Sequence, residues 1–130
     1  MGVRRLEDLI AWQLSVEFKR AVYRLIRAHG RADRDFKYRS QLFDSASSAE
    51  ANVVEGFERY RAREFRLFLS YARASNAEAQ RWLADGIDRG HFTKEACEPV
   101  LVLGRRAGAA IARLQQSLEP FIGPPSRPRR

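Results

Sequence analysis

The chain has 130 residues, and its 24 Lys or Arg against 16 Asp or Glu give a formal net charge of +8. This length suits a single domain, and an apolar fraction of 45% with eight Phe excludes global disorder. No run of about 18 apolar residues predicts a membrane span, and acids near the N-terminus argue against a signal peptide. The single cysteine, Cys97, excludes an internal disulfide and a thiolate zinc cluster. We therefore expect a cytoplasmic protein with no membrane partner.

Helical periodicity runs through most of the chain. Residues 1–98 contain no proline, and sustained strand-like alternation is lacking. Apolar residues at steps of three and four predict four helices, at about residues 7–29, 36–59, 62–88 and 93–119. Short connections between helices of this length favour an all-α, antiparallel up-down-up-down four-helix bundle.

The helix ends have recognisable signals. We expect Gly30 to end the first helix, Gly90 to end the third, and Thr93 to cap the fourth. The bundle is predicted to occupy residues 1–119. Residues 120–130 are rich in Pro and Arg and are predicted to form a flexible, disordered basic tail.

Arginine supplies 21 of the 24 basic residues. Its guanidinium group forms bidentate hydrogen bonds with phosphates and stacks on bases. A first arginine group follows helical steps along the first helix and comprises Arg20, Arg24, Arg27 and Arg31. A second arginine group surrounds the start of the third helix and comprises Arg59, Arg61, Arg63, Arg66 and Arg73. Tyr60 and Tyr71 lie among the second group and could stack on bases. Both groups are candidate nucleic-acid-binding surfaces, and the alternative is a solvated surface that serves only solubility.

Two polar pairs have helical spacing. Asn52 and Glu55 are three residues apart, as are Ser75 and Glu78, so each pair shares a helix face. Di-iron bundles place carboxylates in this way, but they also need Glu-x-x-His pairs, and neither histidine of the chain follows a Glu at that spacing. The sequence therefore favours a buried, structural polar network without a metal. No phosphate-binding loop, dinucleotide fingerprint or zincin motif occurs, so we expect no enzyme, no catalytic residue and no cofactor.

Several segments together resemble a known family. They are Asn52-Val53-Val54-Glu55-Gly56-Phe57, Ser75-Asn76-Ala77-Glu78, and the opening Leu6-Glu7-Asp8-Leu9 with Trp12-Gln13. Over about residues 6–118 the chain resembles the four-helix bundle proteins encoded in 23S rRNA intervening sequences, which include the accessory variability determinant (Avd) of diversity-generating retroelements. The resemblance implies a non-enzymatic bundle that is commonly a homopentamer. It also implies, from the retroelement members, binding to nucleic acid and to a reverse transcriptase.

These observations lead to one functional expectation and one alternative. We expect an oligomeric bundle that presents arginines to RNA, DNA or a nucleic-acid enzyme such as a reverse transcriptase. The alternative is an oligomeric scaffold for another protein, with no nucleic-acid role. The chain departs from the family at Phe43 and Asp44, which replace two usual basic residues. If those basic residues bind RNA in other members, this chain cannot use that same surface.

Overall fold

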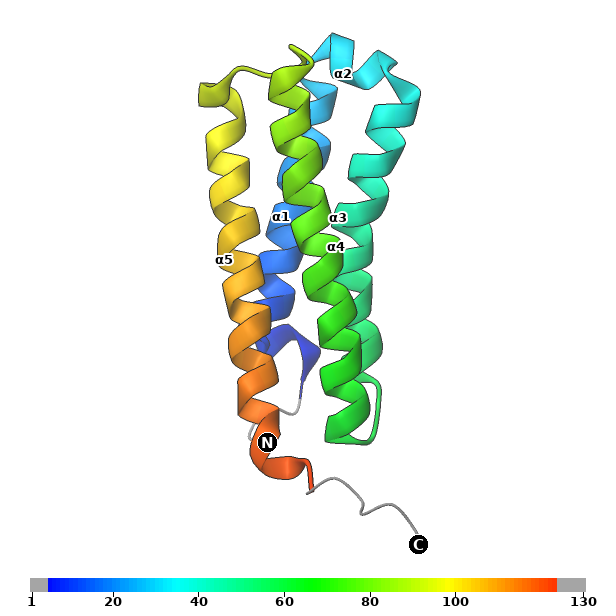
Figure 1. The fold of residues 1–130 in the computed structure, drawn as a ribbon, viewed down its shortest axis with the longest axis vertical. Coiled ribbons are helices and arrows are strands. Elements are labelled where there is room, and N and C mark those ends of the chain that lie inside the picture. The colour runs from blue at the N-terminus through cyan, green and yellow to red at the C-terminus, as the bar shows by residue number, and fades with distance from the viewer. Residues whose placement is uncertain (1–4, 124–130) are drawn as a thin grey trace, which may run out of the picture.

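The computed structural model describes residues 5–123, and every regular element among them is helical. The elements in chain order are the 3₁₀ turn η1 (Leu6–Asp8), α1 (Ile10–Arg27), α2 (Gly30–Arg34), α3 (Phe36–Phe57), α4 (Ala62–Asp88), α5 (Lys94–Leu118) and the 3₁₀ turn η2 (Glu119–Phe121). The four long helices run alternately up and down, as Figure 1 shows. The predicted all-α four-helix bundle is confirmed.

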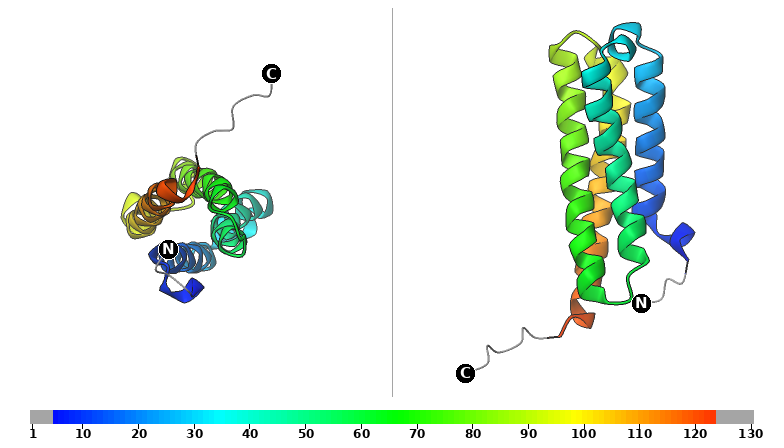
Figure 2. Two further views of the ribbon diagram at one scale, coloured as in Figure 1. Left: turned by 90° about the horizontal axis from the view of Figure 1, so that it is seen from below. Right: turned by 90° about the vertical axis from the view of Figure 1, so that its right-hand side faces the viewer.

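The long helices stand at the corners of a square. α1 and α4 each pack against both α3 and α5, so α1 and α4 occupy opposite corners. Figure 2 shows the two ends of the bundle: α2 crosses one end, and the α3–α4 turn lies at the other. We call these the α2 end and the α3–α4 end. No helix in the described part of the chain has the length and apolar character needed to cross a membrane.

The core follows directly from the apolar stripes of the helices. Towards the α2 end, one buried cluster includes the large side chains of Phe18, Ile26, Tyr38, Leu83 and Phe92. Towards the α3–α4 end, a second cluster includes Leu69 of α4 together with aliphatic side chains of α3 and α5. Because each long helix has two neighbours, its buried stripe is wide, and most of its large apolar residues are buried or half-buried.

Two helix ends lie where the sequence signals predicted them. α4 has the predicted bounds of 62–88, and it ends before Gly90, whose φ of 77° lies in the left-handed region that glycine adopts without a steric penalty. Thr93 caps α5, because its side-chain oxygen accepts a hydrogen bond from the backbone N–H of Ala96 at 3.1 Å.

The prediction of one continuous first helix over 7–29 is wrong. η1 and an extended Leu9 precede α1, which ends at Arg27, and Gly30 begins α2 instead of ending α1. The break turns α2 across the bundle and buries Ala32 completely. His29 stabilises it, because its Nδ1 donates to the carbonyl oxygen of Leu25, 2.7 Å away, at the end of α1.

The predicted flexible tail, 120–130, is described only as far as Gly123. Within that part, Pro120 and Phe121 belong to the 3₁₀ turn Glu119–Phe121, so regular structure extends two residues beyond the predicted end of the bundle at 119. Phe121 and Ile122 line a pocket with residues of the α3–α4 turn. The prediction for residues 124–130 lies outside the described residues.

Two glycines mark close approaches between elements. A Cβ added at Gly104 of α5 would lie 3.0 Å from the Phe18 ring and from Cγ of Gln80. Gly86 of α4 faces the Tyr38 hydroxyl and the Phe92 ring, with less room still. Glycine therefore lets α5 approach α1 and α4, and lets Tyr38 reach α4.

Candidate nucleic-acid interface

The first arginine group lies on two elements. Arg20, Arg24 and Arg27 are on α1, whereas Arg31 is on α2, beyond the break between these helices. All four side chains are exposed. Within residues 5–123, none of the four forms an ion pair with a carboxylate. Their charges are therefore free to attract an external anion.

The second arginine group surrounds the α3–α4 turn and extends along α4, and most of it has internal partners. Arg59 Nη2 lies 2.6 Å from Glu55 Oε1, and its guanidinium lies over the Phe68 ring at 4.7 Å from the centroid. Arg66 pairs with Glu119 at 3.3 Å, and Arg73 donates to the side-chain oxygen of Gln115 at 3.0 Å. Arg61 and Arg63 have no carboxylate partner within residues 5–123.

The structure does not bring the two groups together. The first group extends towards the α2 end, and the second is centred on the α3–α4 end, at the opposite end of the bundle in Figure 1. The sequence spacing correctly indicated that both sets are exposed. The groups lie mainly on α1 and α4, which occupy opposite corners of the bundle.

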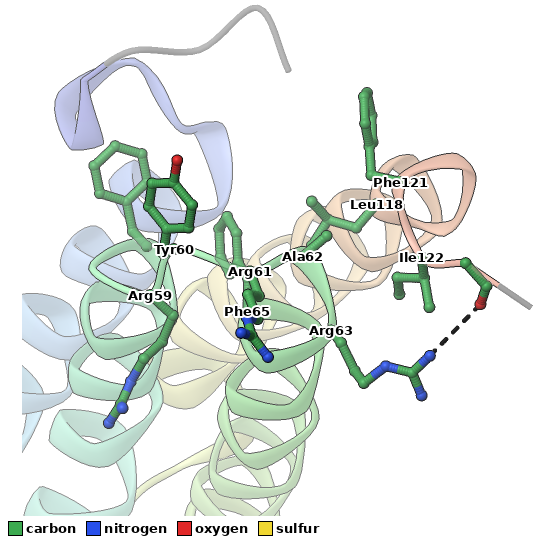
Figure 3. A pocket seen from close by; sticks show the side chains of 11 residues that line it. Arg59, Tyr60, Arg61, Ala62, Arg63, Phe65, Leu118, Phe121 and Ile122 are labelled. Atoms are coloured by element: carbon green, nitrogen blue, oxygen red, sulfur yellow. Dashed lines mark hydrogen bonds between the residues drawn. The ribbon is translucent and has the colours of Figure 1, made fainter. Parts of the chain in front are cut away.

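A pocket of about 590 Å³ opens at the α3–α4 end (Figure 3). Phe57, Phe65, Leu118, Phe121 and Ile122 give it an apolar lining, and Arg59, Tyr60, Arg61 and Arg63 come from the turn and the start of α4. Arg63 donates to the carbonyl oxygen of Gly123 at 3.5 Å, the dashed line in Figure 3. None of the described residues lining the pocket is acidic.

The pocket continues into a groove between α4 and α5. A second hollow of about 500 Å³ shares Arg63 and Ile122 with it and reaches Arg73. A third hollow of about 390 Å³ shares Arg73 with the second and extends to Arg105. Because neighbouring hollows share lining residues, the arginines of the second group lie along one continuous groove. The contribution of Phe121 and Ile122 was not predicted, although an apolar pair directly after Pro120 was a visible signal in the sequence.

The predicted buried network of Asn52, Glu55, Ser75 and Glu78 is wrong in part. Glu55 is at the surface, where its side chain is 51% exposed and pairs with Arg59. Asn52 and Ser75 are half-buried and are linked through Ser48, whose hydroxyl lies 2.9 Å from Ser75 Oγ and accepts from Asn52 Nδ2 at 3.1 Å. Glu78 is half-buried beside Trp82, whose indole N–H donates to it at 3.4 Å.

The error arises because each of the four residues lies one position before a residue of the buried stripe. The buried positions are Val53 and Gly56 on α3, and Asn76 and Ala79 on α4, each one residue after a predicted member. One residue turns a helix by about 100°, which moves a side chain from the core to its edge. Asn76, only 2% exposed, is the buried polar residue of α4, and its Oδ1 accepts from Gln80 at 2.6 Å.

We expect Asn52→Ala to lower the free energy of unfolding by about 0.5–1.5 kcal/mol, because Asn52 donates to both the carbonyl and the hydroxyl of Ser48. Glu55→Ala should cost less than about 0.5 kcal/mol, since it removes only an exposed pair within one helix. Urea unfolding of both variants measures the difference, and a larger loss for Glu55→Ala would contradict these positions.

A polar cluster at the α2 end joins the start of α3 to the α4–α5 turn. Asp35 caps α3 by accepting from the backbone N–H of Tyr38 at 3.3 Å, and it accepts from Nε2 of His91 at 2.9 Å. Arg89 lies 3.5 Å from the same carboxylate and over the Tyr38 ring. The hydrogen bond from His91, supported by Tyr38 and Arg89, holds the pKa of Asp35 below its usual value.

This pKa shift predicts a pH dependence of stability. A lowered pKa in the folded state means that the charge of Asp35 stabilises the fold fully above its usual pKa of about 3.9, and that this contribution disappears as the pH falls through the lowered value. Asp35→Asn keeps a side chain that can cap the helix but removes the charge. In urea unfolding, we expect the variant to have a lower free energy of unfolding than the wild type at pH 7. At pH 3 the difference between the two proteins should be smaller. Asp44→Asn, at an exposed position of α3, is the control, and an equal difference at both pH values would contradict the prediction.

The described residues give little support to metal or thiol chemistry. No group of three or more His, Cys, Asp or Glu side chains within residues 5–123 is placed to hold a metal ion. Burial raises the pKa of the Cys97 thiol to about 11, so the nucleophilic thiolate is scarce at neutral pH. The exposed arginines and the pocket at the α3–α4 end are therefore the candidate functional features of the described residues.

Known proteins show the same fold. Residues 7–112 match the family described as 23S rRNA-intervening sequence protein. A crystal structure of a protein with unknown function from the S23 ribosomal protein family of Bacteroides thetaiotaomicron is similar, with a TM-score of 0.76 and 20% sequence identity. The similarity covers 82% of this chain and 99% of that chain. No curated protein matches the chain.

Proposed function

The chain belongs to the 23S rRNA-intervening sequence protein family, and on that premise we propose that it is a non-enzymatic, self-associating bundle that binds nucleic acid through its arginines. The observation that carries this proposal is the first arginine group. Its four guanidinium groups are exposed, and no carboxylate within residues 5–123 pairs with them.

Such a surface suits a polyanion. Arg20 and Arg27 are seven residues apart on α1, so they are separated by about 10 Å along the helix axis and can reach successive phosphates. Each phosphate contact releases condensed counterions, which favours binding at low salt. The net charge of +8 adds long-range attraction to any nucleic acid. A nucleic-acid enzyme such as a reverse transcriptase is the protein partner that we propose for a bundle of this kind.

Self-association is supported by exposed apolar side chains on several helices. The most exposed on the long helices are Phe36 of α3 and Ile10 of α1, at 67% and 55%, and α4 and α5 add Leu67, Tyr71 and Val102. A subunit contact that covered several of these side chains would remove apolar surface from water, which favours association. We propose a homo-oligomer, with a pentamer as the form implied by the family resemblance. Light scattering should return a mass several times the 15.0 kDa of one chain, and a stable monomer at micromolar concentrations would contradict self-association.

The nucleic-acid proposal is tested by retention of labelled RNA and DNA on the full-length protein between about 50 and 300 mM salt. We expect binding at low salt that weakens as salt rises, with a log–log slope of about −0.7 per phosphate contact for single strands. Failure to retain either nucleic acid at low salt would overturn the proposal. The protein scaffold without a nucleic-acid role would then be the better explanation of the exposed apolar side chains.

A further inference from the structure

We propose that the pocket at the α3–α4 end, together with the groove between α4 and α5, is a binding site for single-stranded nucleic acid, in which an unpaired base enters the pocket. This inference rests on the proposed function, because it assigns a preferred class of nucleic acid and a place for it. The first arginine group attracts any polyanion, whereas this site would recognise a base.

The lining of the pocket combines two kinds of contact. Phe57, Phe65 and Phe121 supply aromatic surface, and Arg61 and Arg63 supply cations without a carboxylate partner in residues 5–123. A volume of about 590 Å³ lies within the range of pockets that take small organic groups, about 300–1,000 Å³. An apolar lining with a cationic rim suits a flat aromatic group that carries a phosphate, which is the composition of a nucleotide.

Tyr60 is the side chain that favours an unpaired base. It lies between Arg59 and Arg61 in the α3–α4 turn, lines the pocket, and is as exposed as in an extended chain, at 102%. A ring in this position packs on little of its own protein and can stack on a base. Bases in a duplex are stacked on one another and hide their faces, so only an unpaired base can use this ring.

The groove gives the strand a path away from the pocket. Its three hollows share lining residues, and the arginines along it are Arg63, Arg66, Arg73 and Arg105. Arg61 at the start of α4 and Arg73 are twelve residues apart, which corresponds to about 18 Å along the helix axis. Glu64 also lines the groove, and Glu119 pairs with Arg66. The strongest attraction for phosphates is therefore at the pocket, around Arg61 and Arg63.

The experiment uses the full-length chain and fluorescently labelled strands of twelve nucleotides. The probes are an oligo-dT strand, an oligo-U strand, a dT strand with abasic sites throughout, and a duplex of the same length. We expect the wild type to bind dT or U more tightly than the abasic strand, because stacking on a base contributes to affinity in addition to the phosphates.

The variants separate the base from the phosphates. Tyr60→Ala should weaken binding of the intact strand by about 5- to 100-fold and leave the abasic strand nearly unchanged, and Tyr60→Phe should retain binding. Tyr60→Phe is the matched control, because it keeps the aromatic ring and removes only the hydroxyl group. The double variant Arg61→Gln with Arg63→Gln should weaken intact and abasic strands alike, with a salt slope smaller by about 1.4.

The outcomes distinguish this inference from the proposed function. If the wild type binds duplex and abasic strands as tightly as intact ones, or if Tyr60→Ala changes nothing, the base pocket is refuted while salt-dependent binding of nucleic acid stands. If no probe binds at low salt, the proposed function fails, and this inference fails with it. A loss specific to Tyr60→Ala and to strands with bases supports the site.

Discussion

Replacing Gly86 by alanine is expected to lower the free energy of unfolding by about 1–3 kcal/mol. The new methyl group would meet the Tyr38 hydroxyl and come within 2.7 Å of the Phe92 ring. Both side chains are buried, so neither can turn into solvent. Overpacking of this kind costs about 1–3 kcal/mol, and disturbing the 2.6 Å bond from Tyr38 to the Trp82 carbonyl adds about 1 kcal/mol. The gain in helix propensity, about 1 kcal/mol, offsets only part of this.

Thermal and urea unfolding measure this effect. For a chain of this length, 1 kcal/mol corresponds to roughly 4 °C in Tm, so a fall of about 4–12 °C is expected. Gly123→Ala is the matched control, because a Cβ there has no heavy atom within 4 Å. Equal stability of the Gly86 and Gly123 variants would mean that Tyr38 and Phe92 do not pack on α4 as described.

Replacing the first arginine group, Arg20, Arg24, Arg27 and Arg31, by glutamine should sharply reduce nucleic-acid binding. Four lost phosphate contacts would shrink the salt slope by up to about 3 units for single strands. The fold should remain, because the four side chains are exposed and each surface substitution costs within about 0.5 kcal/mol. Binding should weaken similarly for unrelated sequences, since phosphates carry no sequence information.

Glutamine variants of Arg59, Arg63 and Arg66 give the comparison for this result. Two of these three already pair with Glu55 and Glu119, so their removal should shrink the slope by less. Circular dichroism confirms that each variant is folded. An undiminished slope in both sets would show that neither arginine surface contacts phosphate.

Local signals explain what could be predicted from the sequence. The bounds of α4 and the cap of α5 follow from apolar spacing, a glycine and a threonine, all of which act within one or two helical turns. The break after α1 could not be predicted in this way. It depends on Ala32 becoming buried and on His29 reaching the carbonyl of Leu25, and both depend on the packing of α2 over the bundle.

The site was harder to predict than the fold for a similar reason. The exposure of the arginines follows from helical spacing, but the pairing of Arg66 with Glu119 joins residues that are 53 positions apart. The pocket likewise needs Phe65 and Phe121 to meet at one end of the bundle. Such long-range contacts depend on how the helices pack, and helix packing leaves no local pattern in a single sequence.

The arrangement of the helices also determines how the chain can assemble its own core. Three of the four contacts between neighbouring long helices join helices consecutive in the sequence, apart from the short α2, and only α1 with α5 closes a long loop. Low contact order of this kind favours rapid folding, because little chain entropy is lost before each hairpin forms. The described chain also begins and ends near the α3–α4 end (Figure 1). A circular permutant that connects these ends and opens the α4–α5 turn would therefore keep every helix pair, with α4 and α5 becoming the pair that closes last.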